Sequence, residues 1–114
     1  MPKRKDLKLD EYNISTYCYR ELYNFCMQHR ERLARLSDRE DPAAQQNRAD
    51  VEVVLRSAQE TSPQFWKPLL KSVTEQDIRY ETLRHYEGLH MGERKFRHLR
   101  RKFFYILAKN LKKV

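Results

Sequence analysis

Apolar side chains recur every three or four residues along most of this chain, the spacing that places them on one face of an α-helix. The first run extends from Asp10 to about Leu36 and predicts one long helix. Tyr17, Tyr19 and Tyr23 flank its apolar stripe and suit the rim of a core, because each ring carries a polar tip. The stripe itself comprises Cys18, Leu22, Phe25, Cys26, His29, Leu33 and Leu36.

Capping signals predict where the next helices begin. After the linker SDRED at 37–41, Asp41 can cap free N–H groups and Pro42 supplies a preset φ, so a second helix is expected from Pro42 to about Glu60. Its expected inner face comprises Val51, Val54, Leu55 and Ala58.

Capping residues are again followed by a proline in Thr61-Ser62-Pro63, which predicts a short third helix with Trp66 in the core. Pro68 should kink or restart that helix, since a proline inside a helix removes a hydrogen bond. The pairs Ser72-x-x-Glu75 and Thr74-x-x-Asp77 then offer capping arrangements for a fourth helix. That helix is expected to carry Ile78, Tyr80, Leu83 and Tyr86.

Gly88 stands where a helix would end through a left-handed residue, so the segment EGLHMG at 87–92 is predicted to be a tight turn. A fifth helix should start near Glu93. At about 100° per residue, its large apolar side chains occupy one sector about 160° wide. These are Phe96, Leu99, Phe103, Phe104, Ile106, Leu107 and Leu111. Arg100 projects into that sector, where it could snorkel or pair with Glu81 or Glu87.

These patterns predict an all-α, single-domain bundle of about five helices over residues 1–114. Residues 10–71 would form the supporting helices and residues 72–114 a helix-turn-helix-like part with a long basic C-terminal helix. Two glycines, four prolines and 35% charged residues agree with a helical fold. No apolar run reaches the ~20 residues that a membrane span needs and no signal peptide is evident, so a cytoplasmic protein without membrane association is expected.

The charge distribution changes this picture. The chain carries a net charge of +8, and all of it falls within Met91 to Val114, where nine Lys and Arg residues accompany the single acid Glu93. Such a one-sided imbalance favours a polyanionic partner. The alternative is a solvated basic face.

A helix, a short turn and a second helix with one apolar and one basic face form the layout of a helix-turn-helix. The second helix would enter the major groove of double-stranded DNA. Its earlier residues would lie near base edges or flanking phosphates and its later ones nearer the backbone. The predicted DNA-binding residues are Arg94, Lys95, Arg97, His98, Arg101, Lys102, Tyr105 and Lys109.

Catalytic motifs are not found: there is no phosphate-cradling loop, zinc-protease motif or nucleophile elbow. A non-enzymatic protein without a cofactor is therefore expected. Cys18 and Cys26 would lie roughly 12 Å apart along one helix, too far for a disulfide, and should be half-buried thiols. The spacing of Cys26 and His29 lacks a second matching pair, so no metal site is predicted.

Two stretches carry a resemblance to a known family. The segment YCYRELYNFCMQHRER at 17–32 and, more specifically, VTEQDIRYETL with GERKFRHLRRKFFYIL within 73–107 resemble late-gene transcriptional regulators of phages and prophages in Firmicutes. These are the RinA and ArpU type, whose C-terminal part is similar to the helix-turn-helix of sigma-factor region four. The resemblance implies a helical fold, promoter DNA or RNA polymerase with DNA as partner, and control of late or packaging genes.

A second hypothesis of a different class remains open. The protein could be a phage or mobile-element interaction module that binds RNA polymerase or packaging machinery rather than free DNA. The basic helix would then meet an acidic partner, and the tyrosine-rich first helix would be a docking surface. Single-strand or RNA binding is disfavoured, because Phe96 and Phe103 fall on the apolar side of the wheel. A homodimer is a further expectation, since one helix contacts only a short site.

Overall fold

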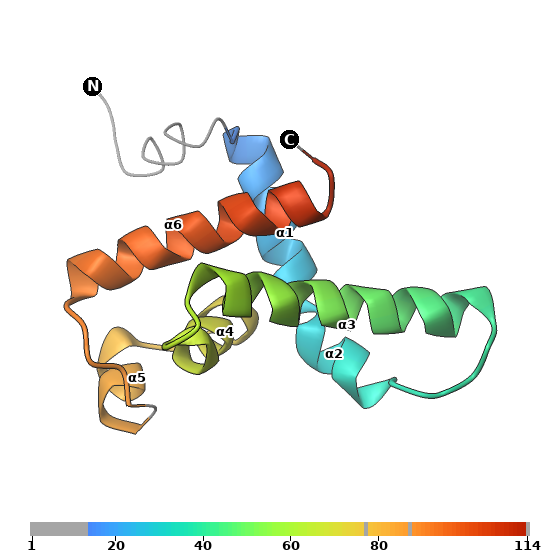
Figure 1. Cartoon of the computed structure of the whole chain (residues 1–114), viewed down its shortest axis with the longest axis horizontal. Helices are drawn as coiled ribbons and strands as arrows, with labels where there is room; N and C mark the ends of the chain where they lie inside the picture. Colours follow the sequence, from blue (N-terminus) through green and yellow to red (C-terminus); the bar gives the residue numbers. More distant parts are fainter. Residues whose placement is uncertain (1–13, 77, 87, 114) are drawn as a thin grey trace.

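The computed structural model of the protein describes residues 14–76, 78–86 and 88–113, and the described residues form six α-helices (Figure 1). The predicted all-α fold is confirmed. The count exceeds the expected five because the first predicted helix is two, α1 (Thr16–Met27) and α2 (His29–Ala34).

The prediction of one helix from Asp10 to Leu36 is wrong at its start and near its middle; Asp10 itself lies outside the described residues. Ile14 and Ser15 precede α1, and the Ser15 hydroxyl caps it by accepting from the Cys18 N–H at 3.1 Å. The break falls at Gln28, whose N–H reaches only three residues back, to the Phe25 carbonyl at 3.3 Å. The Arg32 guanidinium donates to that same carbonyl and so stabilises the break.

The break changes which face of α2 is buried. Arg32 is only 7% exposed, whereas Leu33 and Leu36, both expected in the apolar stripe, are 45% and 46% exposed. Arg32 contacts α3 (Pro42–Thr61): its Nε lies 3.8 Å from Asp50 Oδ2, and its carbonyl accepts from Asn47 Nδ2 at 2.9 Å. The stripe therefore holds for Leu22, Cys26 and His29 but ends there.

Helix α3 begins as predicted, with Asp41 Oδ1 accepting from the Ala44 N–H at 2.9 Å. Val54 and Ala58 are buried as expected, but Val53 is buried in place of Val51. The buried face also includes Ser57 and Thr61. Their hydroxyls donate to the carbonyls four residues earlier, at 2.7 Å each, which allows two polar side chains to lie within an apolar interface.

Helix α4 (Trp66–Thr74) begins after a turn in which the Ser62 hydroxyl accepts from the Phe65 N–H at 2.9 Å. Trp66 is partly buried against the core, as expected. Pro68 does not interrupt α4, because it lies in the first turn, where its missing N–H breaks no helical hydrogen bond.

The predicted caps for the fourth helix are wrong. Ser72 and Thr74 lie inside α4 and donate to the carbonyls of Leu69 and Leu70. Asp77, the other end of the second pair, lies outside the described residues. Helix α5 (Tyr80–Tyr86) is shorter than expected, and Ile78 precedes it.

The turn after α5 is confirmed. Gly88 has a φ of +70°, in the left-handed region that favours glycine, and the Leu89 N–H bonds back to the Leu83 carbonyl at 3.3 Å. Leu83 and Leu89 are both buried, so the turn also adds to the core.

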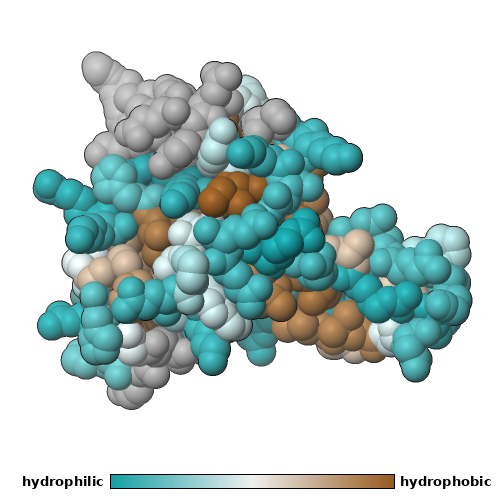
Figure 2. All heavy atoms as spheres, viewed as in Figure 1, coloured by the Kyte–Doolittle hydropathy of each residue, from teal (hydrophilic) through white to brown (hydrophobic). Residues whose placement is uncertain are grey.

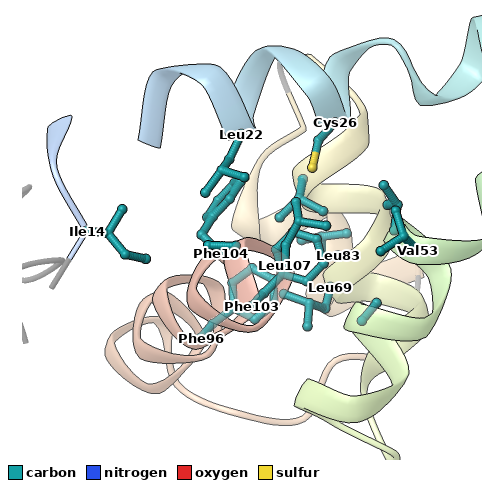
Figure 3. Packing of buried hydrophobic residues seen from close by; sticks show 14 of the residues in the cluster. Ile14, Leu22, Cys26, Val53, Leu69, Leu83, Phe96, Phe103, Phe104 and Leu107 are labelled. Carbon is teal, nitrogen blue, oxygen red and sulfur yellow. The ribbon is translucent and has the colours of Figure 1, made fainter. Parts of the chain in front are cut away.

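Helix α6 (Glu93–Asn110) begins where the sequence predicts and packs most extensively along α3, with further contacts to α1 and α4. Figure 3 shows Leu22 and Cys26 of α1 directed toward Phe104 and Leu107 of α6. At its far end, Asn110 Nδ2 donates to Ser57 Oγ at 2.9 Å and to Glu60 Oε1 at 3.0 Å. Helices remote in sequence are thereby joined into one core.

The described helices make an elongated molecule with extents of 48 × 32 × 23 Å. In Figure 1, α6 follows the upper edge with α3 below it, and the start of α3 projects with the 37–41 loop at the right. Within the described ranges, no helix combines the length and apolar character needed to cross a bilayer.

Candidate nucleic-acid interface

Helix α6 presents two chemically different faces. Its inner face is buried and apolar, and comprises Phe96, Phe103, Phe104, Leu107 and Ala108. The centre of the Phe104 ring lies 5.0 Å from that of the Tyr19 ring of α1 and 5.1 Å from that of the Phe103 ring, both in edge-to-face geometry. This packing fixes α6 on the bundle and determines which side chains point outward.

The outward side of α6 carries exposed cations and no acid. We call this the basic face, and its exposed members are Arg94, Lys95, His98, Lys102 and Lys109. Eighteen residues at 1.5 Å each make α6 about 27 Å long, so the face spans several turns. In Figure 2, hydrophilic residues dominate the visible surface, with apolar side chains showing between them near the centre.

Arg101 and Tyr105 are also on this side but are half-buried. Arg101 Nη2 lies 2.7 Å from His98 Nδ1, whereas its Nε is buried without a hydrogen-bond partner. Lys109 Nζ lies 5.4 Å from the centre of the Tyr105 ring, a cation–π geometry. These contacts within α6 restrain the side chains of the basic face.

Arg97 is the predicted site residue that the structure separates from the basic face. It is exposed, but its Nη2 donates to Glu93 Oε2 at 2.9 Å, and it borders a pocket together with Phe96 and Arg100. Seven of the eight predicted DNA-binding residues therefore share one side of α6, and Arg97 lies at the edge of that side, next to the pocket.

Arg100 also differs from its predicted role. Among the described residues no ion pair joins it to Glu81, and Glu87 lies outside them. Its side chain instead lines the same pocket as Arg97, with its Nε buried and without a hydrogen-bond partner. The sequence signal for this position was present, because Arg100 was the one cation in the apolar sector, but its neighbours come from other helices.

The support of α6 is only partly that of the predicted helix-turn-helix. Tyr80 of α5 contacts Phe96 with ring centres 6.3 Å apart, and its hydroxyl donates to the Met91 carbonyl. The main support is α3, which supplies Val54 and Ala58. The order helix, turn, helix is present as α5, the Gly88 turn and α6, while the earlier helices complete the bundle.

The two cysteines are free thiols, as predicted. Burial raises the pKa of the Cys26 thiol to about 12, against the opposing charges of Arg32 and Arg100, so it stays protonated near neutral pH. Among the described residues, no group of three or more His, Cys, Asp or Glu side chains is placed to hold a metal ion.

Comparison of the chain with known protein families, curated proteins and solved structures finds no match.

Proposed function

We propose that the protein binds double-stranded DNA through the basic face of α6 and thereby regulates transcription. The observation that carries the proposal is the exposure of Arg94, Lys95, His98, Lys102 and Lys109 along one rigidly held helix with no acid among them. The resemblance of residues 73–107 to regulators of late phage genes supports late or packaging genes as the target.

The geometry of α6 suits a duplex. A helix with its side chains is about 10–12 Å across, which matches the ~12 Å width of the major groove. Because the phenylalanines anchor the opposite side of α6, the basic face would meet the groove without reordering the helix. Little conformational entropy would then be lost on binding.

The position of each side chain along α6 suggests its task. Arg94, Lys95 and His98 lie in the first two turns, where a recognition helix usually contacts base edges. Lys102 and Lys109 lie further along and would contact phosphates. Arg97 is engaged by Glu93, so we assign it a smaller contribution than the sequence predicts.

The test measures duplex affinity by fluorescence anisotropy over a series of salt concentrations. The triple variant Lys95→Gln, Lys102→Gln, Lys109→Gln should weaken binding and reduce the slope of log K against log salt by about two, because Lys102 and Lys109 would contact phosphates and each phosphate contact contributes roughly 0.9. The matched control, Arg20→Gln, Arg30→Gln, Arg35→Gln, removes the same charge from exposed positions on and beside α1 and α2.

The comparison of the two triple variants decides the proposal. If both weaken binding equally, the interaction reports net charge alone, and the assignment of α6 is wrong. If the wild-type protein does not bind duplex DNA at moderate salt, DNA binding itself is refuted. Selection of duplexes from a random pool would show whether one sequence is preferred.

A second candidate function is binding to RNA polymerase or packaging machinery. Tyr17 is 80% exposed, and Leu33 of α2 and Leu36 just after it are also exposed, which gives this part of the chain apolar surface for a protein partner. Tyr19 and Tyr23 are instead packed against the core. Of the three tyrosines, Tyr17 is therefore the one available for such a contact.

The two functions are separated by affinity capture from nuclease-treated host lysate. Recovery of polymerase or packaging proteins that is lost in Tyr17→Ala, together with no binding to free duplex, would favour the second candidate. Capture that disappears with nuclease treatment would favour DNA.

A further inference from the structure

A pocket lies beside the first turns of α6, on the side away from the basic face. Its volume is about 260 Å³. An engineered protein cavity of ~150 Å³ holds benzene, so this pocket has room for a molecule with one substituted ring. Four helices and the segment before α5 meet there, and we call it the α6 pocket.

The lining of the α6 pocket is mixed, and more of its surface is polar than apolar. Met27, Ile78, Leu83 and Phe96 supply aliphatic and aromatic surface, and Tyr23 and Tyr80 add two rings. Leu83 and Phe96 are buried parts of the core. A ligand with an apolar ring and a charged substituent would contact both kinds of surface.

The charged residues of the pocket determine the sign of the ligand. Glu93 Oε2 is held by Arg97 at 2.9 Å, and Glu75 Oε2 lies 3.7 Å from Lys71 Nζ. Both lining carboxylates therefore already have cationic partners, and Arg97 already has an anionic one. Arg100 is the remaining charged side chain of the lining.

Arg100 has hydrogen-bonding capacity that the described residues do not use. Its Nε is buried and has no hydrogen-bond partner. Other polar groups of the lining are engaged: the Tyr80 hydroxyl donates to Met91 and the Ser72 hydroxyl to Leu69. Because Arg100 is partly exposed and lines the pocket, a carboxylate there would accept a charge-assisted bond from the other nitrogens of the same guanidinium.

From these observations we infer that the α6 pocket binds a small organic anion, a carboxylate carried on a single apolar ring, with Arg100 as its counter-ion. The ring lies against Leu83 and Phe96, and the carboxylate meets the guanidinium near the mouth formed by Glu93 and Arg97. This site is separate from the basic face and does not depend on DNA binding.

The test is a titration of the full-length protein with benzoate, followed by two-dimensional NMR of backbone amides and Ile and Leu methyl groups. Saturable shifts should centre on Ile78, Leu83 and Phe96. Benzamide and benzamidine, which have the same ring with no charge or a positive charge, should bind more weakly. Tighter binding of benzamidine would overturn the inference, as would the absence of saturable shifts with benzoate.

Two variants with opposite expected effects strengthen the test. Arg100→Gln should lower benzoate affinity roughly ten- to a hundredfold, because a hydrogen bond to a charged group is lost. Glu93→Gln should raise affinity by about two- to fivefold, since it frees Arg97 from a solvent-exposed ion pair.

The control is Arg84→Gln, which removes an exposed arginine from α5 outside the pocket lining and should leave affinity unchanged. Equal affinities for wild type and a folded Arg100→Gln would refute the role of Arg100. If Arg100→Gln does not fold, the result for Glu93→Gln decides, because unchanged or weaker binding there would contradict an anion site. No DNA enters the experiment, so its outcome is independent of the proposed function.

Discussion

Two basic side chains, His29 and Arg32, are buried one turn apart on α2, at 4% and 7% exposure. Arg32 is stabilised by the Phe25 carbonyl, the Phe25 ring 4.0 Å from its Cζ, and Asp50. His29 Nδ1 has no hydrogen-bond partner. Local contacts therefore stabilise the buried arginine, while burial favours the neutral form of the histidine and lowers its pKa.

This difference predicts a dependence of stability on pH. Burial, and then the charge of Arg32, lowers the pKa of His29 below its ordinary value of 6.5. The unfolded chain then binds more protons than the folded one between the lowered pKa and 6.5, so stability falls as the pH drops through that window. The loss should be at most about 1.4 kcal/mol per pH unit.

The measurement is the free energy of unfolding in urea between pH 5 and 8. His29→Gln should be less sensitive to pH over this range than the wild type, whereas His90→Gln, which removes an exposed imidazole, should keep the wild-type sensitivity. If the free energy of unfolding changes equally with pH in the wild type and in His29→Gln, His29 is not the cause of the pH dependence.

At the scale of the elements, helix ends with local signals could be predicted from the sequence. Asp41 with Pro42 and Gly88 act within three residues of themselves, so α3 begins and α5 ends where expected. The break at Gln28 could not be predicted this way, since it depends on Arg32 reaching Phe25 while also meeting Asp50 of α3. The same holds for the predicted cap of α5, because Thr74 is buried inside α4, which outweighs its preference for a helix start.

The candidate site could likewise be predicted from the sequence only in part. The basic face follows from helical periodicity, because most of its members are exposed and their positions depend on α6 alone. The surroundings of Arg97 could not be predicted from helical periodicity, because they depend on where the pocket opens between α1, α4, α5 and α6. Periodicity within one helix carries no information about a cavity that other helices complete.

The two glycines at the ends of α5 and α6 give a matched prediction. Gly88→Ala should destabilise the protein by about 1 kcal/mol, because its φ of +70° disfavours a Cβ even though no atom lies within 4 Å of one. Gly92→Ser should stabilise it by about 0.5–1 kcal/mol, since Gly92 is an N-cap in extended backbone and makes no side-chain cap.

Thermal or urea unfolding of both variants measures this pair of effects. Because a Cβ at either position meets nothing within 4 Å, packing contributes little, and the sign of each change reports the backbone. Destabilisation by both substitutions would mean that Gly92 requires the conformational freedom of glycine, although its φ of −70° is open to other residues.

At the scale of the whole molecule, the predicted division into supporting helices (10–71) and a C-terminal part (72–114) describes positions in the sequence rather than two independently stable units. The face of α3 that carries Val54 and Ser57 is covered by α6, and Lys113 Nζ of the C-terminal end lies 2.9 Å from Glu21 Oε1 of α1. We therefore expect both parts to form one cooperative unit.

Separate fragments test this expectation. Residues 1–71 alone should show little stable helix by circular dichroism, and mixing with residues 72–114 should restore helicity and a single unfolding transition. A fragment 1–71 that unfolds cooperatively on its own would instead identify an independent subdomain.

The packing of α6 on α3 also has a consequence for synthesis. Five of the fifteen buried hydrophobic residues in the described part of the chain, from Phe96 to Ala108, lie on α6, and Asn110 bonds to Ser57 across 53 positions of sequence. The emerging chain cannot close this core until α6 leaves the ribosome. Premature termination anywhere before Phe96 would release a product whose exposed valines invite chaperones and proteases, so cells should accumulate chains that contain α6 and almost none that lack it.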